Sequence, residues 1–173
     1  MHIKTIVTAV LCLAAVAAVV LSAGCVGGGD QGAKDGDSVS VFYTLTVDGV
    51  QKESNFGSTP LTFTIGAGTM IKGFNDGVIG MKAGETKTIV VPPENGYGVY
   101  SKEKKTELQL SDIKKAVGQV SVGDTLILNN GQWHAEILSI DEEKGTADAA
   151  VNHPLAGKTL TFKIQLASIN PGK

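Results

Sequence analysis

Residues 65–98 contain the side chains on which the chemistry of this chain depends. The segment holds a glycine-rich turn, the run Met-Ile-Lys-Gly-Phe, a β-like run and a closing Pro-Pro-Glu-Asn-Gly-Tyr-Gly. No pair of acids, no nucleophile beside a base and no metal-ligating cluster stands out in it. It offers instead apolar side chains, the Tyr97 phenol and backbone that glycines leave open. These groups suit the binding of a peptide rather than chemical attack on one.

Alternating apolar and polar residues predict a β-sheet around this segment. Ser38–Val47 and residues 61–65 alternate in this way, so each is predicted to be a strand with one buried face. An Asp-Gly pair after the first strand predicts a tight turn. Thr86–Val91 predicts a further strand, which two prolines end. The short glycine-rich stretch 73–81 can form one or two helical turns if its apolar residues press onto the sheet.

The sequence over residues 100–150 predicts a small β-rich unit. Charged residues 101–105 indicate a crossing, and the Ser-Asp pair at 111–112 favours a short helix that ends at Gly118. Two strand-like runs around an Asn-Asn-Gly turn predict a hairpin, and a short strand follows a Lys-Gly turn. Trp133, on this hairpin, is expected to pack into the small core of the unit.

The last strand-like run, residues 158–169, is long and alternates cleanly. This regularity suits a central strand of the first sheet rather than a strand of the small unit. The chain therefore leaves its first domain and returns to it. We predict a discontinuous domain at 37–99 and 151–170, with an inserted domain at 100–150, because exposed loops tolerate insertions.

The N-terminus has the pattern of an export signal. After Lys4, residues 6–23 are almost wholly apolar and lead to Ser-Ala-Gly-Cys, which resembles the lipobox of prokaryotic lipoproteins. We expect residues 1–24 to be a signal peptide and Cys25 to be lipidated. The alternative is an uncleaved anchor helix, since the run approaches the ~20 residues of a membrane span. Either segment places the domain at the extracytoplasmic face of the cell membrane, on a flexible glycine-rich linker over residues 25–36.

Composition excludes several classes of function. The cysteines, Cys12 and Cys25, both lie in the export segment, so the folded part has no disulfide or thiol chemistry. The 15 basic residues are all lysines, and against 17 acids they leave a net charge of −2, which disfavours nucleic-acid binding. His2, His134 and His153 are scattered, so no metal site is expected. We expect His153 to fix its loop.

An ordered set of residues resembles a known family. The set comprises Tyr43, Asp48-Gly49, Pro60-Leu61-Thr62-Phe63, Ile65-Gly66, Met70-Ile71, Gly73-Phe74, Gly80-Met81, Gly84-Glu85 and Tyr97-Gly98. In this order the residues resemble FKBP-type peptidyl-prolyl cis–trans isomerases. The block 100–150 followed by Asn-His-Pro-Leu-Ala-Gly-Lys-Thr-Leu resembles the SlyD-like branch, in which an insert-in-flap domain replaces the usual flap loop. The resemblance covers nearly all of residues 37–169.

The resemblance implies an α+β fold: an FKBP-like antiparallel half-barrel sheet wrapped around a short helix, with an apolar pocket between them and a small β-rich insert-in-flap domain. The substrate-binding residues that it implies are Leu61, Phe63, Met70, Phe74 and Phe162. The catalytic residues that it implies are Tyr43, Glu53, Ile71 and Tyr97. In such a site Phe74 is the floor, where many relatives have tryptophan. The Ile71 backbone N–H and the Tyr97 hydroxyl hold carbonyls of the bound peptide.

Several positions depart from the family pattern or have a simpler interpretation. Glu53 stands where the family usually has aspartate, and Lys52 where it usually has an apolar residue. Leu61 replaces an aromatic residue common in relatives without the insert. Glu53 can instead be an ordinary surface carboxylate. Phe63 and Phe162 can be ordinary core residues, since both alternate on predicted strands.

The reaction of this family needs neither an acid–base pair nor a cofactor. The barrier to rotation about an X–Pro bond is about 18–20 kcal/mol and comes from amide resonance, and rotation breaks no bond. A twisted amide has lost much of its charge separation, so an apolar cavity disfavours it less than the planar form. A site that binds the twisted amide more tightly therefore accelerates the rotation.

We therefore expect a monomeric peptidyl-prolyl isomerase with chaperone activity on exported or envelope proteins. Its partners would be unfolded or proline-containing polypeptides, which the inserted domain captures by strand addition. One alternative is a membrane-tethered, client-binding chaperone lipoprotein whose isomerase activity is vestigial. A purely structural envelope lipoprotein would explain the leader and the linker but makes no use of Tyr97.

Overall fold

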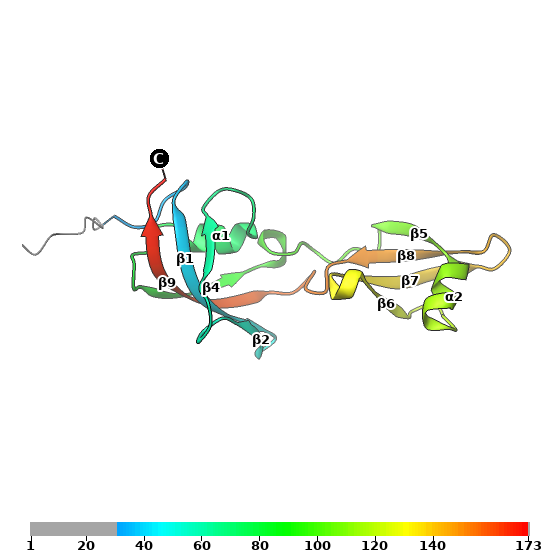
Figure 1. The fold of residues 1–173 in the computed structure, drawn as a ribbon. Helices are drawn as coiled ribbons and strands as arrows, with labels where there is room; N and C mark the ends of the chain where they lie inside the picture. Colours follow the sequence, from blue (N-terminus) through cyan, green and yellow to red (C-terminus); the bar gives the residue numbers. More distant parts are fainter. Residues whose placement is uncertain (1–30, 173) are drawn as a thin grey trace, which may run out of the picture.

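The computed structural model of the chain describes residues 31–172, which form two lobes, each built on its own antiparallel sheet (Figure 1). The expected signal or anchor segment and Cys25 lie outside the described residues. Among the helices of residues 31–172, none has the length and apolar character of a membrane span.

The first lobe is a five-stranded antiparallel sheet. Its central strands are β1 (Ser38–Val47) and β9 (Leu160–Asn170), which pair along their whole length. β2 (Val50–Ser54) and β3 (Leu61–Thr64) pair with opposite ends of β1, and β4 (Thr86–Val91) pairs with β9. The last strand of the chain therefore lies at the centre of the first sheet, as the sequence predicted.

The predicted face of β1 is the buried one. Val39, Val41 and Leu45 are buried in the main core, and Tyr43, on the same face, is partly buried against it. Asp48 and Gly49 join β1 to β2 with φ values of 51° and 77°. Two successive positive φ values are characteristic of the two-residue hairpin turn that an Asp-Gly pair favours.

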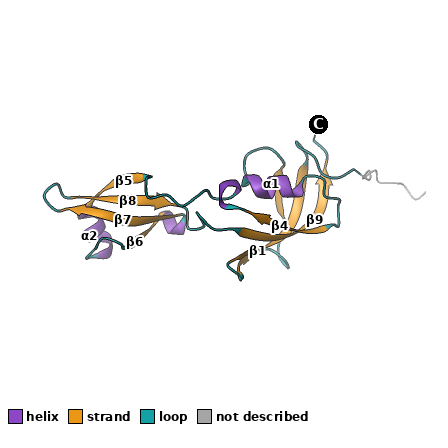
Figure 2. Cartoon of the chain, turned by 180° about the vertical axis from the view of Figure 1, so that it is seen from behind, coloured by secondary structure: helices purple, strands orange, loops and turns teal. Residues whose placement is uncertain are grey.

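The short helix α1 (Lys72–Val78) lies across one face of this sheet, over β4 (Figure 2). Phe74, Val78 and Met81 are all buried in the main core. A helix of this length is unstable alone, so its formation depends on the burial of these side chains. The structure thus confirms the predicted packing of residues 73–81 onto a sheet.

Two glycines allow α1 to approach β4 closely. A Cβ atom at Gly73 would lie 2.4 Å from Cγ1 of Val91, and one at Gly77 would lie 2.5 Å from Cδ1 of Ile89. Real Cβ atoms do not approach other heavy atoms so closely. The glycines that weaken the helix in isolation are therefore required for its packing.

The second lobe is inserted between β4 and β9. Its sheet has the order β5-β8-β7-β6, with β5 (Lys105–Gln109), β6 (Thr125–Leu128), β7 (Trp133–Asp141) and β8 (Thr146–Asn152). Helix α2 (Leu110–Val117) packs on this sheet. Two short 3₁₀ turns complete the elements: η1 (Pro93–Asn95) follows β4, and η2 (Asn129–Gly131) joins β6 to β7.

Two predictions in this lobe need correction, and one strand was not predicted. The crossing predicted for residues 101–105 ends where β5 begins at Lys105, and β5 pairs with β8. Helix α2 begins at Leu110 after Gln109, without a side-chain cap, so the Ser-Asp pair does not cap it. Trp133 is 42% exposed and lies outside the small core. It begins β7 at the end nearest the first lobe, away from α2, and contacts His153 instead.

The end of the expected linker belongs to the fold. Ala33 is buried, its N–H donates to the Met81 carbonyl at 2.8 Å, and its own carbonyl accepts from the Gly80 N–H at 2.7 Å. Asp37 then accepts hydrogen bonds from the N–H groups of Lys34 and Gly172, which joins the two ends of the first lobe. These pairings are long-range, so composition alone assigned residues 33–36 to the linker wrongly.

Candidate active site

The ring of Phe74 is the centre of an aromatic cluster. Its centroid lies 5.0 Å from that of Phe162, 5.7 Å from that of Tyr43 and 5.8 Å from that of Phe63. The four rings come from α1, β9, β1 and β3, and the contacts are edge-on or tilted, as aromatic pairs prefer. The fold therefore brings together four predicted site residues that are distant in sequence.

The other predicted apolar residues border the same cluster. Leu61, Met70 and Ile71 are partly buried and pack against the main core, as Tyr43 does. Phe63 and Phe162 are themselves buried core residues. Their interpretation as ordinary core is therefore correct for their burial, while the neighbouring Tyr43, Leu61, Met70 and Ile71 are only partly buried.

Ile71 precedes α1 and has extended backbone angles of φ −59° and ψ 145°. Its carbonyl accepts the N–H groups of Phe74 and Asn75, both at 3.1 Å, so it starts the helix. The first N–H groups of a helix have no partner within the helix. Among the hydrogen bonds of residues 31–172, none uses the Ile71 N–H, which leaves this donor beside the aromatic cluster.

The Tyr43 hydroxyl donates a hydrogen bond of 2.5 Å to the Glu53 carboxylate. Burial, and second this hydrogen bond, raise the pKa of Tyr43 above the ordinary value of a phenol. The Tyr43 backbone is held as well, since its N–H donates to Oδ1 of Asn55 at 2.6 Å. Glu53 lies at the surface, so the site has an exposed carboxylate that fixes a half-buried phenol.

Tyr97 lies on the loop after η1, between two glycines. The loop is fixed because the Gly98 N–H donates to the Pro93 carbonyl at 2.7 Å. Burial and the charge of Glu53 raise the pKa of the Tyr97 phenol, so it is a neutral donor at physiological pH. Within residues 31–172 no hydrogen bond to its hydroxyl is found. The charge of Glu53 also raises the pKa of the Tyr43 phenol, so this carboxylate acts on both phenols.

His153 is a neighbour of Tyr97 that the sequence did not reveal. The two rings are stacked, with centroids 3.7 Å apart and planes inclined by 2°. The predicted loop-fixing role is confirmed, because the Leu155 N–H donates to Nδ1 of His153 at 3.1 Å. The stack was missed because it joins two segments that approach each other only where the chain leaves and re-enters the first lobe.

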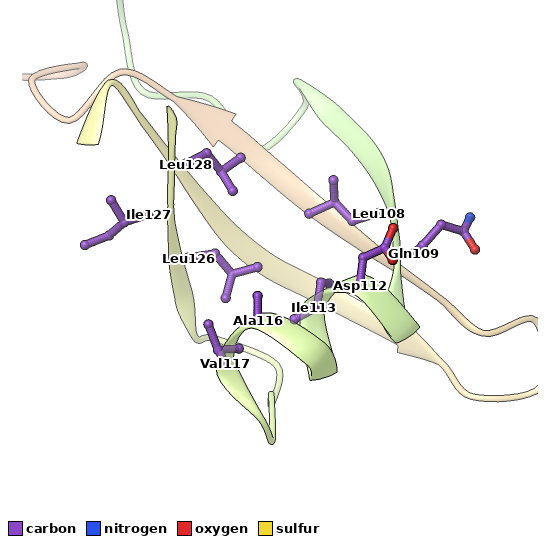
Figure 3. A pocket seen from close by; sticks show the side chains of 9 residues that line it. All are labelled: Leu108, Gln109, Asp112, Ile113, Ala116, Val117, Leu126, Ile127 and Leu128. Carbon is purple, nitrogen blue, oxygen red and sulfur yellow. The ribbon is translucent and has the colours of Figure 1, made fainter. Parts of the chain in front are cut away.

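A separate apolar groove lies in the inserted lobe, between α2 and β6 (Figure 3). Its volume is about 270 Å³. Its apolar lining includes Leu108, Ile113, Ala116, Val117, Leu126 and Leu128. Leu126 and Leu128 point toward the helix, whereas Ile127 at the rim points away from it. β6 is an edge strand of its sheet, so the groove borders backbone that is open to a further strand.

Residues 31–172 contain no group of three or more His, Cys, Asp or Glu side chains arranged to hold a metal ion. The chemical groups of the site are therefore aromatic and aliphatic surface, two neutral phenols, one carboxylate and a backbone N–H. Such groups bind and orient a peptide.

Comparisons with known proteins agree with this description. The family model of the FKBP-type peptidyl-prolyl cis-trans isomerases matches residues 29–167. A short-type peptidyl-prolyl cis-trans isomerase of Methanocaldococcus jannaschii is 36% identical over 154 residues, which cover 81% of this chain and 96% of the relative. A probable FKBP-type 16 kDa peptidyl-prolyl cis-trans isomerase of Pseudomonas fluorescens is 30% identical over 135 residues, 76% of this chain and 87% of the relative.

A more distant relative is the isomerase SlyD of Vibrio cholerae, which is 28% identical over 133 residues, 75% of this chain and 65% of the relative. The antiparallel sheets and short helices agree with the family's fold. The chain therefore belongs to the FKBP-type peptidyl-prolyl cis–trans isomerases, enzymes that act on proline-containing polypeptides.

Proposed function

We propose that the aromatic cluster around Phe74 binds the proline ring of an X–Pro segment and that this is where the chain isomerises its substrates. The convergence of four aromatic rings on Phe74 is the observation that carries the proposal. The proposed binding residues are Leu61, Phe63, Met70, Phe74 and Phe162. Burial of a proline ring among them contributes binding free energy of roughly 25 cal/mol per Å² of apolar surface.

The proposed catalytic step is rotation of the X–Pro bond without bond breaking. The planar amide is more polar than the twisted one, so apolar surroundings raise the energy of the planar form relative to the twisted form. The enzyme then needs only to favour the twisted amide, which lowers the barrier of about 18–20 kcal/mol. Neutral phenols fit this role, because neither places a full charge beside the rotating bond.

Polar contacts orient the substrate in this proposal. The Ile71 N–H and the Tyr97 hydroxyl, neither of which has an intramolecular partner within residues 31–172, hold carbonyls on either side of the proline. Tyr43 is held in place by Glu53 and forms one wall of the site. Tyr97→Phe tests this assignment, because it removes the hydroxyl and keeps the ring.

We infer that the inserted lobe captures unfolded polypeptide for the isomerase site and that the protein belongs to the SlyD-like branch. Support comes from the apolar groove between α2 and β6, from the open edge of β6, and from the similarity to a protein named SlyD. An extended segment can add to such an edge while its apolar side chains enter the groove.

The proposed location is the extracytoplasmic face of the cell membrane, where clients would be exported proteins. This proposal rests on the sequence alone: residues 1–24 as a signal peptide or retained anchor, and Cys25 as the lipidated residue. Mass spectrometry of the mature N-terminus tests it. A diacylglyceryl cysteine at position 25 supports the lipoprotein, and an intact Met1 in the membrane fraction supports the anchor.

A refolding assay limited by proline isomerisation tests the functional proposal. Wild type is expected to accelerate refolding, and Tyr97→Phe to lower that acceleration.

Val117→Asp, in the groove, should abolish action on unfolded proteins while proline tetrapeptides are still turned over. Val122→Asp is the matched control, because Val122 is equally apolar and exposed in the same lobe but outside the groove. If both Asp variants lose the same amount of activity on unfolded proteins, the groove does not have the proposed capture role.

A further inference from the structure

The position of the Tyr97 phenol depends on one neighbouring ring. Tyr97 is 39% exposed, and its two neighbours in the chain are glycines, which have no side chains to pack against its ring. Its broad contact is the face-to-face stack with His153, at a centroid separation of 3.7 Å. The Gly157 N–H also donates to the Gly98 carbonyl at 2.8 Å, which ties together the two segments that carry the stacked rings.

His153 is in turn fixed from two sides. Its Nδ1 accepts the Leu155 N–H at 3.1 Å, so the neutral imidazole carries its proton on Nε2. The edge of Trp133, from the start of β7, approaches the same imidazole at a centroid distance of 6.2 Å and an angle of 84°. The imidazole therefore links the isomerase lobe to the inserted lobe.

The surroundings of His153 oppose its protonation. Burial, and second the charge of His134 on β7, lower the pKa of His153 below the ordinary value of histidine. The titratable groups that face the stack are His134, the Tyr97 phenol and, beyond it, Glu53. If Nδ1 were protonated, its N–H would face the Leu155 N–H, so two hydrogen-bond donors would face each other. This clash and the partial desolvation outweigh the attraction of a cation to the Tyr97 face.

We propose that His153 is a positioning residue, which holds the Tyr97 phenol at the isomerase site while the imidazole is neutral and releases it when the imidazole is protonated. This inference rests on the proposed role of Tyr97 as the group that binds a substrate carbonyl. Because that contact exists in both the ground state and the transition state, its loss raises KM more than it lowers kcat. Acidification through the lowered pKa of His153 therefore raises KM.

The test measures kcat and KM of the full chain for a proline tetrapeptide between about pH 5 and 8. Trp133 is the single tryptophan of the chain, and an imidazolium beside a tryptophan quenches its fluorescence. Because His134 is adjacent to Trp133, only the part of the quenching that is lost in His153→Phe reports protonation of His153, and it does so independently of activity. In wild type, KM should rise on acidification, and the midpoint of this rise should coincide with the midpoint of the fall in fluorescence. At neutral pH His153→Ala should have a KM roughly threefold to tenfold above that of wild type, the value of one hydrogen bond, and this KM should stay the same on acidification.

Two variants separate stacking from titration. His153→Phe keeps a flat ring against Tyr97 but cannot be protonated, so it should retain most of the wild-type activity and lose the step in KM. His134→Gln removes the neighbouring charge without touching the stack. Because that charge lowers the pKa of His153, the steps in KM and in fluorescence should both move to higher pH.

Tyr97→Phe distinguishes failure of this inference from failure of the proposed site. If Tyr97→Phe leaves KM unchanged, the carbonyl-binding role of Tyr97 is wrong, and the positioning role of His153 fails with it. If Tyr97→Phe raises KM while His153→Ala does not, only the positioning role is overturned. A step in KM that persists in His153→Phe would also overturn it, because another group would then be titrating.

Discussion

Tyr43 and Tyr97 are two neutral phenols that use their protons differently. Burial and the nearby Glu53 carboxylate raise the pKa of both, so each remains protonated well above neutral pH. The Tyr43 hydroxyl donates a hydrogen bond to Glu53, whereas the Tyr97 hydroxyl has no acceptor among residues 31–172. This division favours Tyr97 as the phenol that contacts a substrate and Tyr43 as a fixed part of the site.

Substitution of Glu53 tests whether its charge or its oxygen atom matters. We expect Glu53→Gln to keep kcat/KM within about twofold, because an amide oxygen still accepts the Tyr43 hydrogen bond. Glu53→Ala should lower kcat/KM roughly twofold to tenfold, the net value of one hydrogen bond. Tetrapeptide isomerisation rates provide the measurement. A large loss in Glu53→Gln would contradict this expectation and assign the role to the negative charge.

Phe74 supports both the core and the site. It is 1% exposed, and we expect Phe74→Ala to lower the free energy of unfolding by about 3–5 kcal/mol as well as to reduce activity. Phe56→Ala is the control: Phe56 is 43% exposed and stacks on Phe42 away from the cluster, so its removal should cost less than about 1 kcal/mol. Denaturant unfolding measures both, and similar losses would contradict the central position of Phe74.

Single residues differ in how far the sequence reveals their role. Tyr97 could be selected from the sequence because a phenol between two glycines is unusual for a packing residue. Its partner His153 could not be selected in this way, because the two rings meet only where the chain leaves the first lobe and where it returns to it. Trp133 was predicted to pack into the small core because it lies on the inserted hairpin. It does alternate with the buried Ala135 and Ile137 on β7, but this alternation does not show where the helix α2 ceases to cover the strand.

At the scale of the element, strands with one buried face were predictable and a polar edge strand was not. β1 and β4 have the predicted bounds because their alternation reflects burial or strong β-propensity. β5 carries mostly exposed polar residues, so its pairing with β8 leaves little mark on the sequence. In α1, the glycines predicted a weak helix, whereas close packing on β4 requires them.

Gly73→Ala tests this requirement. In an ordinary helix the change would stabilise by roughly 0.5–1 kcal/mol. Here the new Cβ meets Cγ1 of buried Val91 at 2.4 Å, and the stiff branched side chain cannot rotate away freely, so we expect a loss of about 1–3 kcal/mol. Gly77→Ala should cost less, because its shortest contact, 2.5 Å, is to the terminal Cδ1 of Ile89, which can rotate away, and the next, to Cγ2 of Ile89, is 3.2 Å.

Thermal unfolding measures the stability of these variants, and a second substitution at Val91 provides a control. Val91→Ala is destabilising by itself, but it removes the atom that obstructs a side chain at position 73. Combined with Gly73→Ala it should therefore destabilise less than the sum of the two single changes. Additive losses would show that the close approach of α1 to β4 is not the source of the effect.

At the scale of the whole molecule, the insertion was predictable from the return of a regular strand after the small unit. The junction was not. Asn152 is 3% exposed, accepts the Ser101 N–H at 3.0 Å and donates to the Ser101 carbonyl at 2.9 Å. Glu136 adds an outer contact by accepting from Lys102 at 2.6 Å and from Tyr100. One buried amide thus joins the outgoing and returning segments, beside the Tyr97–His153 stack.

Asn152→Ala should therefore separate the two activities that we propose. Loss of both amide contacts leaves the Ser101 backbone groups unpaired, which costs about 1–3 kcal/mol and loosens the junction between the lobes. Hydrogen exchange at Ser101 should accelerate. Refolding of a long proline-containing protein should slow more than tetrapeptide turnover, because only the long client needs the groove and the isomerase site together. Glu136→Gln is the control, since exposed ion pairs contribute about 0–1 kcal/mol. Equal losses of Asn152→Ala on both substrates would mean that the lobes do not cooperate through this junction.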